Sequence, residues 1–218
     1  MNYNRKSAEG RRQQKSISFF YFLHVLSWII FCFAMPADEI TYRLACAADA
    51  AAIARVQVES WRESFRGILD QAWLDSMSIA QRTESYRQRL TGESEFYHLL
   101  VAEDRGTVVG ICDVGAARKE ETFGCAAELY SLYLDINYQR RGIGRELFRR
   151  AAELLIADGR NSMYLEALAE NPYRRFYEQL GGELVARGQL ERLGREYMTV
   201  FYRWLDLAQT LRTLTRRA

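Results

Sequence analysis

The amino-acid sequence predicts an α/β fold in which a central mixed β-sheet is flanked by helices and follows an apolar N-terminal extension. Three observations support this class. A hairpin signal lies before residue 115, a strand–helix–strand unit spans 128–167, and a closing hairpin spans 183–204. Early antiparallel strands that are followed by a β-α-β unit predict a sheet with both parallel and antiparallel pairs. The expected element order is β-α-α-β-β-β-α-β-α-β-β.

The early part of the domain is predicted to contain one strand and a pair of helices. Ile40–Leu44 is the first strand, and Asp49 is a plausible N-cap for the helix that follows it. This helix breaks near Gly67. A second helical stretch at 71–90 is interrupted at 76–78.

Three strands follow the helices. The runs 96–102 and 107–114 are joined by a turn that contains Arg105-Gly106 and predict a hairpin. A polar, charged loop at 116–124 comes next. The apolar run 128–134 is then expected to be a buried strand.

The last part of the chain carries two more helices and three strands. A helix at 142–157 has apolar residues at helical spacing and leads to a strand at 162–167. In "ENPYRRFYEQLGG", Asn171 is placed to cap a short helix that ends at Gly181. The chain closes with two strands and a short basic helix or frayed end, at 183–187, 196–204 and 207–218.

Composition indicates a globular domain rather than a nucleic-acid binder. The sequence is 49% hydrophobic and 27% charged, and its net charge is +2. Residues 1–15 contribute +4, which leaves −2 for the rest of the chain. The four cysteines show no CxxC pair and there are only two histidines, so neither a metal site nor a disulfide framework is expected.

The N-terminal extension, residues 1–35, allows three interpretations. The segment 17–35 is almost wholly apolar and follows basic residues, which is typical of a membrane anchor or of a signal sequence. The third interpretation is a start site assigned too far upstream, with translation beginning at Met35. We expect the last, and therefore a catalytic domain at 36–218 in the cytoplasm; the alternative is a single-pass membrane protein.

The stretch "QRRGIGRELF", which begins at Gln139, lies where a strand turns into a helix. A helix N-terminus offers unpaired N–H groups and partial positive charge, so it attracts phosphate. Gly142 and Gly144 let the backbone approach an anion closely. Nearby arginines add positive charge, at positions Arg140, Arg141 and Arg145. A tight turn without a ligand is the alternative explanation of this spacing.

Gln139–Gly144 resembles the Q/R-x-x-G-x-G/A signature of the GCN5-related N-acetyltransferases, the GNAT family. "SWRESFRGIL" resembles the first helix pair of bacterial members, and "ENPYRRFYEQLGG" resembles the family's second cofactor motif. With the strand order, the resemblance covers roughly residues 38–206. It implies a GNAT fold and an enzyme that moves an acetyl group from acetyl-coenzyme A to a primary amine.

The resemblance also assigns cofactor-binding residues. The glycine loop would hold the pyrophosphate through Gln139, Arg140, Arg141, Gly142, Ile143, Gly144 and Arg145. The preceding strand would splay from its parallel neighbour and pair its main chain with the pantetheine arm, at Leu132, Tyr133 and Leu134. Asn171 can contact the same arm, cap its helix, or do both.

Two residues are expected to carry the chemistry. A primary amine is mostly protonated at neutral pH, so a base must remove a proton. Glu128 lies at the start of the strand before the loop, where the family often has its base, and a solvent-facing or arginine-paired glutamate is the alternative. Tyr177 lies where the family's general-acid tyrosine usually is, and a packing role is its alternative.

The acceptor amine can belong to a small molecule or to a peptide or protein. A non-catalytic acyl-CoA sensor and a membrane-tethered interaction module are the competing functions. A homodimer is an open expectation, because many relatives dimerise.

Overall fold

The computed structural model of the chain describes residues 40–92, 96–192 and 194–215. The expectations for residues 1–35, and for the apolar segment 17–35 in particular, lie outside the described residues. The described part of the chain forms one compact unit that begins at Ile40.

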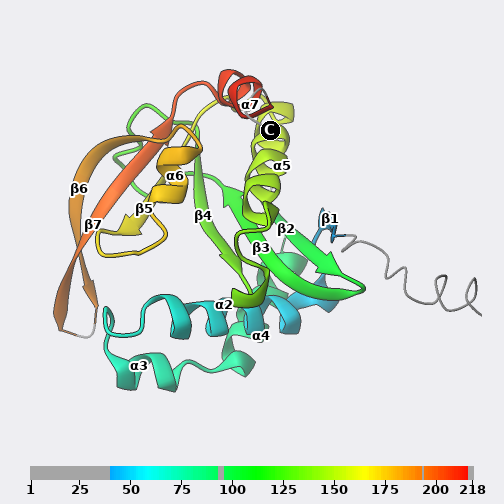
Figure 1. Ribbon diagram of the computed structural model, residues 1–218, viewed down its shortest axis with the longest axis vertical. Coiled ribbons are helices and arrows are strands. Elements are labelled where there is room, and N and C mark those ends of the chain that lie inside the picture. The colour runs from blue at the N-terminus through cyan, green and yellow to red at the C-terminus, as the bar shows by residue number, and fades with distance from the viewer. Residues whose placement is uncertain (1–39, 93–95, 193, 216–218) are drawn as a thin grey trace, which may run out of the picture. The chain divides into compact units, whose positions relative to one another are not determined.

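A seven-stranded sheet organises this unit (Figure 1). The strand order is β1-β2-β3-β4-β5-β7-β6, and the β4–β5 pair is parallel whereas the other pairs are antiparallel. The mixed sheet predicted from the sequence is therefore confirmed. The strands are β1 (Ile40–Leu44), β2 (Tyr97–Asp104), β3 (Thr107–Gly115), β4 (Ala127–Leu134), β5 (Met163–Leu168), β6 (Glu183–Arg192) and β7 (Arg195–Trp204).

Helices cover both faces of the sheet. The α-helices are α2 (Ala50–Ser64), α3 (Gln71–Ser76), α4 (Ile79–Thr91), α5 (Ile143–Ala157), α6 (Arg175–Gln179) and α7 (Leu207–Thr215), and short 3₁₀ turns are η1 (Ala47–Asp49) and η2 (Ile136–Tyr138). Alternate residues of β2 and β3 pack in two different clusters: one cluster includes α5 and α7, and the other includes α2 and α4. Because successive strand residues point to opposite faces, these helix pairs lie on opposite sides of the sheet.

The amphipathic pattern of α5 explains its place in the core. Leu147, Phe148, Ala151 and Leu155 are buried at helical spacing against the sheet. The strongly apolar β3 is buried over almost its whole length, because it is covered on both faces.

Several expected boundaries change, each for a local reason. Asp49 is in helical conformation, and its carboxylate accepts the N–H of Cys46 and pairs with Arg43 instead of capping α2. The helix expected from Asn171 begins only at Arg175, because Asn171 starts a turn in which its Oδ1 accepts the Tyr173 N–H at 2.8 Å. The closing hairpin is also longer than expected, since β6 and β7 pair from end to end.

Candidate active site

The parallel strands β4 and β5 pair at one end and then separate. The paired residues are Ala127 with Met163 and Glu128 with Tyr164, and no later residue of β4 pairs with β5 (Figure 1). A bulge accompanies the separation: Leu129 pairs with β3, Tyr130 does not, and Ser131 resumes the pairing. The separation opens a gap in the middle of the sheet beside the last residues of β4.

The register of β4 decides which main-chain groups face this gap. The N–H of Asp135 donates to Val109 of β3, so the alternation of antiparallel pairs directs the main chain of Tyr133 toward β3 as well. Leu132 and Leu134 then direct their main-chain groups away from β3. The carbonyl of Leu134 accepts the Ser60 hydroxyl at 2.8 Å. Of the three expected pantetheine partners, Leu132 and the N–H of Leu134 therefore face the gap, and Tyr133 contributes its side chain.

The glycine loop ends at an uncapped helix. Gly142 is the N-cap of α5, has φ +82°, and supplies no side-chain cap. The first helical hydrogen bond is the one from Glu146 N–H to the Gly142 carbonyl, at 3.1 Å, so the N–H groups of Ile143, Gly144 and Arg145 have no acceptor within the helix. This end of α5 therefore offers unpaired donors together with the positive end of the helix dipole.

The two glycines are required for different reasons. Gly142 adopts the left-handed conformation, and an added Cβ would meet nothing within 4 Å. Gly144 is buried, and its Cβ would come within 3.3 to 3.4 Å of the Phe176, Leu132 and Leu134 side chains. Gly144 thus allows α5 to pack closely on β4 and α6, whereas Gly142 makes the turn.

The three arginines of the loop have different surroundings. Arg140 is exposed, has φ +63°, and within the described residues makes no hydrogen bond or ion pair. The guanidinium of Arg141 lies 4.9 Å from the ring centroid of Tyr138. Arg145 donates to the Leu214 carbonyl at the end of α7. The expectation that Arg145 adds mobile charge at the loop is therefore wrong, because its guanidinium holds the end of α7.

Tyr177 lies on α6 and lines a cavity at the gap. It follows Phe176 on α6, packs on Tyr202 with ring centroids 6.1 Å apart, and lines a cavity together with Asn171. Within the described residues its hydroxyl makes no hydrogen bond. Burial raises the pKa of the Tyr177 phenol well above its usual value, and charges on Tyr133 and Cys112 add to the increase. The phenol therefore keeps its proton at neutral pH.

Glu128, expected from the sequence to be the base, is buried and fully hydrogen-bonded. It is 2% exposed and its two oxygens accept four hydrogen bonds, three from Arg118 and one from the Tyr164 hydroxyl at 3.0 Å. A carboxylate has about four lone-pair sites, so Glu128 is saturated. Arg118 lines the cavity, whereas Glu128 does not.

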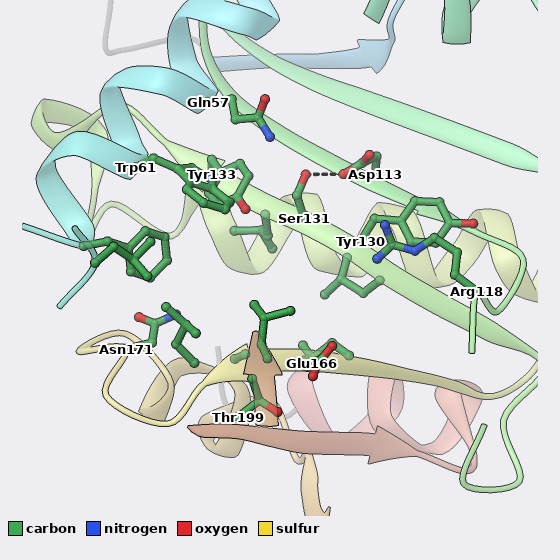
Figure 2. A pocket seen from close by; sticks show the side chains of 18 of the residues that line it. Gln57, Trp61, Asp113, Arg118, Tyr130, Ser131, Tyr133, Glu166, Asn171 and Thr199 are labelled. Carbon is green, nitrogen blue, oxygen red and sulfur yellow. Dashed lines mark hydrogen bonds between the residues drawn. The ribbon is translucent and has the colours of Figure 1, made fainter. Parts of the chain in front are cut away.

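A cavity of about 330 Å³ occupies the α2–α4 side of the gap (Figure 2). Its walls come from α2, α4, α6 and from strands β3 to β7. Trp61 on α2 and Phe65, directly after α2, line it.

Buried polar atoms without partners gather in this cavity. Among the described residues, four buried side-chain atoms lack a hydrogen-bond partner: Gln57 Oε1, Trp61 Nε1, Glu166 Oε1 and Thr199 Oγ1. All four residues line the cavity, and Figure 2 shows Gln57 and Trp61 on one wall and Glu166 and Thr199 on the facing wall. Buried polar atoms without partners are costly, so a polar ligand that pairs with them would be stabilised.

Two further carboxylates line the cavity and were not identified as site residues from the sequence. Asp113 on β3 is 2% exposed and accepts hydrogen bonds from Ser131 and from the Tyr97 hydroxyl at 3.1 Å; burial raises its pKa. Glu166 on β5 pairs through one oxygen with Lys119 at 2.7 Å and leaves the other unpaired. Each is the lone charged residue inside an apolar strand run, which is the signal that could have identified them.

The described residues contain no group of three or more His, Cys, Asp or Glu side chains that could hold a metal ion. A search of the same part of the chain for a helix both long and apolar enough to cross a membrane found none.

Comparisons with known proteins agree with this geometry. A family model described as "Acetyltransferase (GNAT) domain" matches residues 95–181. The chain is 34% identical over 180 residues to the "Uncharacterized N-acetyltransferase YuaI" of Bacillus subtilis, a match that covers 82% of this chain and 99% of YuaI. It is 31% identical over 111 residues to the "L-amino acid N-acyltransferase MnaT" of Escherichia coli, which covers 51% of this chain and 61% of MnaT.

A solved structure adds the donor. The putative acetyltransferase yncA of Salmonella typhimurium, determined with its cofactor acetyl-CoA, is 25% identical with a TM-score of 0.59, and the match covers 77% of this chain and 94% of that one. The uncapped N-terminus of α5 and the gap beside β4 suit a pyrophosphate with an extended arm, and so does Arg140, which makes no ion pair within the part of the chain that the structure describes. The chain therefore belongs to the GNAT family of acetyltransferases, and it is an N-acetyltransferase whose acyl donor is acetyl-coenzyme A.

Proposed function

We propose that the enzyme transfers the acetyl group directly to the primary amine of a small molecule. The observation that carries this proposal is the polar cavity of about 330 Å³ beside the gap between β4 and β5, with unpaired buried donors and acceptors on facing walls. Its volume is at the lower end of the roughly 300–1,000 Å³ of small-molecule sites. The name of the relative MnaT, an L-amino acid N-acyltransferase, also favours a small acceptor. A peptide or protein amine is the alternative, and it would need a path for the rest of its chain.

The donor is held by main-chain groups more than by side chains. The N–H groups of Ile143, Gly144 and Arg145 and the guanidinium of Arg140 would bind the pyrophosphate, with Gln139 and Arg141 beside them. Leu132, Leu134 and Asn171 would orient the pantetheine arm. When bound, acetyl-coenzyme A supplies an acyl group already activated as a thioester, and positioning supplies much of the rate of such a direct transfer.

Tyr177 would act as the general acid. Its hydroxyl has no protein partner among the described residues, lines the cavity, and keeps its proton because burial raises its pKa. It can therefore donate that proton to the departing thiolate, a role that contributes typically about 10²- to 10⁴-fold.

The proton of the acceptor amine would pass to Glu166 rather than to Glu128. Glu128 would have to release a hydrogen bond before it could accept a proton, and it reaches the cavity only through Arg118. Its proposed role is to hold the Arg118 side chain, whose guanidinium lies 4.0 Å from the Tyr130 ring centroid. Glu166 has the unpaired oxygen and faces the cavity, so it is the group best placed to receive the amine.

The test is acceptor selectivity with the full-length protein. We expect thiol release and a mass increase of one acetyl group with members of a panel of small primary amines, with saturable kinetics. Peptides with free N-termini or lysines form the second arm. Turnover confined to the peptide arm would contradict the small-molecule acceptor and favour the alternative.

A homodimer and a cytoplasmic location stay predictions. Sedimentation velocity of the purified protein tests the first. Fractionation of expressing cells, with mass spectrometry of the mature N-terminus, tests the second and decides between the interpretations of residues 1–35.

A further inference from the structure

Two arginines of the cavity have no negative partner. Arg82 on α4 and Arg192 at the end of β6 both line it and are half-buried. Within the described residues neither guanidinium makes an ion pair or a hydrogen bond. The other two arginines of the cavity are compensated: Arg118 pairs with Glu128, and Arg89 lies 3.9 Å from Asp113.

The uncompensated arginines lie close enough to repel each other. The pKa of Arg192 is lowered first by burial and then by the positive charge of Arg82. Like charges that are half-buried together destabilise the empty site. An anion placed between them would remove that cost and gain charge-assisted hydrogen bonds from both.

Aromatic rings fix the Arg192 side chain at this place. Its guanidinium lies 4.8 Å from the ring centroid of Trp73 and 5.6 Å from that of Trp61. Trp61 in turn packs edge-on against Tyr133 of β4, with ring centroids 6.2 Å apart. The arginine pair is thus tied to the strand that borders the gap.

A third donor lies beside the pair. The indole Nε1–H of Trp61 is buried, can only donate, and meets no acceptor in good hydrogen-bond geometry within the described residues, although the Tyr133 hydroxyl lies near it. Two planar guanidinium groups and one N–H match the flat, two-oxygen geometry of a carboxylate better than they match a single point charge. Across the cavity the unpaired groups, Glu166 Oε1 and Thr199 Oγ1, favour a hydrogen-bond donor instead (Figure 2).

We propose that Arg82, Arg192 and the Trp61 indole form a carboxylate-binding subsite, and that the acceptor is a free amino acid. Its carboxylate lies between the two arginines, and its amino group points across the cavity to Glu166. This inference rests on the proposed function, because it assigns the class of the small amine. It adds a binding site for the acceptor's carboxylate, which the transfer reaction itself does not require.

The experiment compares matched acceptors with the full-length enzyme. Each triad is an L-amino acid, its amide and its decarboxylated amine, beginning with the leucine and phenylalanine series and extending to the other amino acids. All three keep a primary amine, and only the first carries a carboxylate. We expect kcat/KM for the best amino acid to exceed that of its amide and its amine by at least 100-fold.

Variants locate the effect. Arg82→Gln and Arg192→Gln should each raise KM for the best amino acid at least tenfold, while kcat/KM for the decarboxylated amine stays the same or rises. Arg187→Gln is the matched control, because it makes the same change on β6 at an exposed residue that does not line the cavity. Affinity for acetyl-coenzyme A, measured by calorimetry, should stay within threefold in all variants.

Two results would overturn the inference. One is equal use of amino acid, amide and amine by the wild-type enzyme; the other is an equal loss for all three acceptors in the arginine variants. Either would leave the proposed acetylation of small amines intact. Activity on peptides alone would instead contradict the proposed function itself.

Discussion

Replacing Gly142 with aspartate should abolish tight binding of acetyl-coenzyme A without unfolding the protein. An added Cβ meets nothing within 4 Å, so the change is not blocked sterically. The φ of +82° is a left-handed conformation, which costs a non-glycine residue about 1–2 kcal/mol. A negative side chain at a helix N-terminus offsets about 0.3–1 kcal/mol of that cost. The unliganded variant should therefore lose no more than about 2 kcal/mol of unfolding free energy.

The negative charge stabilises the helix N-terminus but weakens the binding of acetyl-coenzyme A. Two unit charges about 4 Å apart repel by about 1 kcal/mol in water and by about 4 kcal/mol at the effective dielectric near a protein surface. The new carboxylate would face the pyrophosphate at the N–H groups of Ile143 and Gly144. We expect the Kd of acetyl-coenzyme A to rise between about fivefold and about a thousandfold.

Gly142→Asn is the matched variant, since it has the same shape and tolerates the same backbone conformation without the charge. Calorimetric titration of acetyl-coenzyme A and a thermal unfolding curve should be recorded for both. The aspartate variant should be at least as stable as the asparagine variant and should bind far more weakly, with a difference that narrows as salt increases. Equal affinities in the two variants would refute the assignment of this helix end to phosphate.

Three other predictions concern the catalytic groups and the stability of the domain. Tyr177→Phe should lower kcat at least 100-fold while the Kd of acetyl-coenzyme A stays within threefold. Because burial raises the pKa of this phenol, its ionisation should not lower the kcat of the wild-type enzyme up to about pH 10. An equal loss of kcat and of affinity for acetyl-coenzyme A in the variant would indicate a packing role instead. Glu166→Gln should lower kcat/KM for the acceptor at least 100-fold with the Kd of acetyl-coenzyme A within threefold, whereas Glu128→Gln should lower kcat/KM less, because Glu166 has the unpaired oxygen at the cavity. The reverse order would support Glu128 as the base. Arg43 lowers the pKa of Asp49 to about 2, so Asp49→Asn should cost about 1–2 kcal/mol at pH 7, discounted for the partial exposure of Arg43. A carboxyl whose pKa is lower in the folded than in the unfolded protein stabilises the fold above the unfolded-state pKa, and this stabilisation is lost as the pH falls through the folded-state pKa. The unfolding free energies of the two proteins, measured by urea titration, should therefore converge between about pH 4 and pH 2.

Local sequence patterns predicted the helices and strands, because turns, caps and helical spacing depend on residues that are close together in the chain. The turn at Arg105-Gly106, the glycine loop and the apolar spacing of α5 each act within a few residues. The corrections arose where a side chain found a partner that was not the expected one. Asp49 is the clear case, because Arg43 and the Cys46 N–H occupy its carboxylate.

The sequence by itself determined the fold class, through the order of its strands and helices, and the acyl donor, through the resemblance of Gln139–Gly144 to a family signature, because both depend on local patterns. Only the tertiary structure decided which carboxylate is available. Glu128 is saturated by Arg118 and Tyr164, whereas Glu166 faces the cavity with one oxygen unpaired. These differences depend on contacts between residues far apart in the chain, which no local pattern encodes.

The proposed acceptor site shows most clearly what the sequence determines and what only the tertiary structure determines. Arg82 and Arg192 are two of many arginines in the sequence, and nothing in their neighbours along the chain distinguishes them. They meet because α4 and the end of β6 border one cavity, and they remain uncompensated because no carboxylate of the described residues reaches them. The charge of a side chain is written in the sequence, but whether that charge is neutralised is decided by packing.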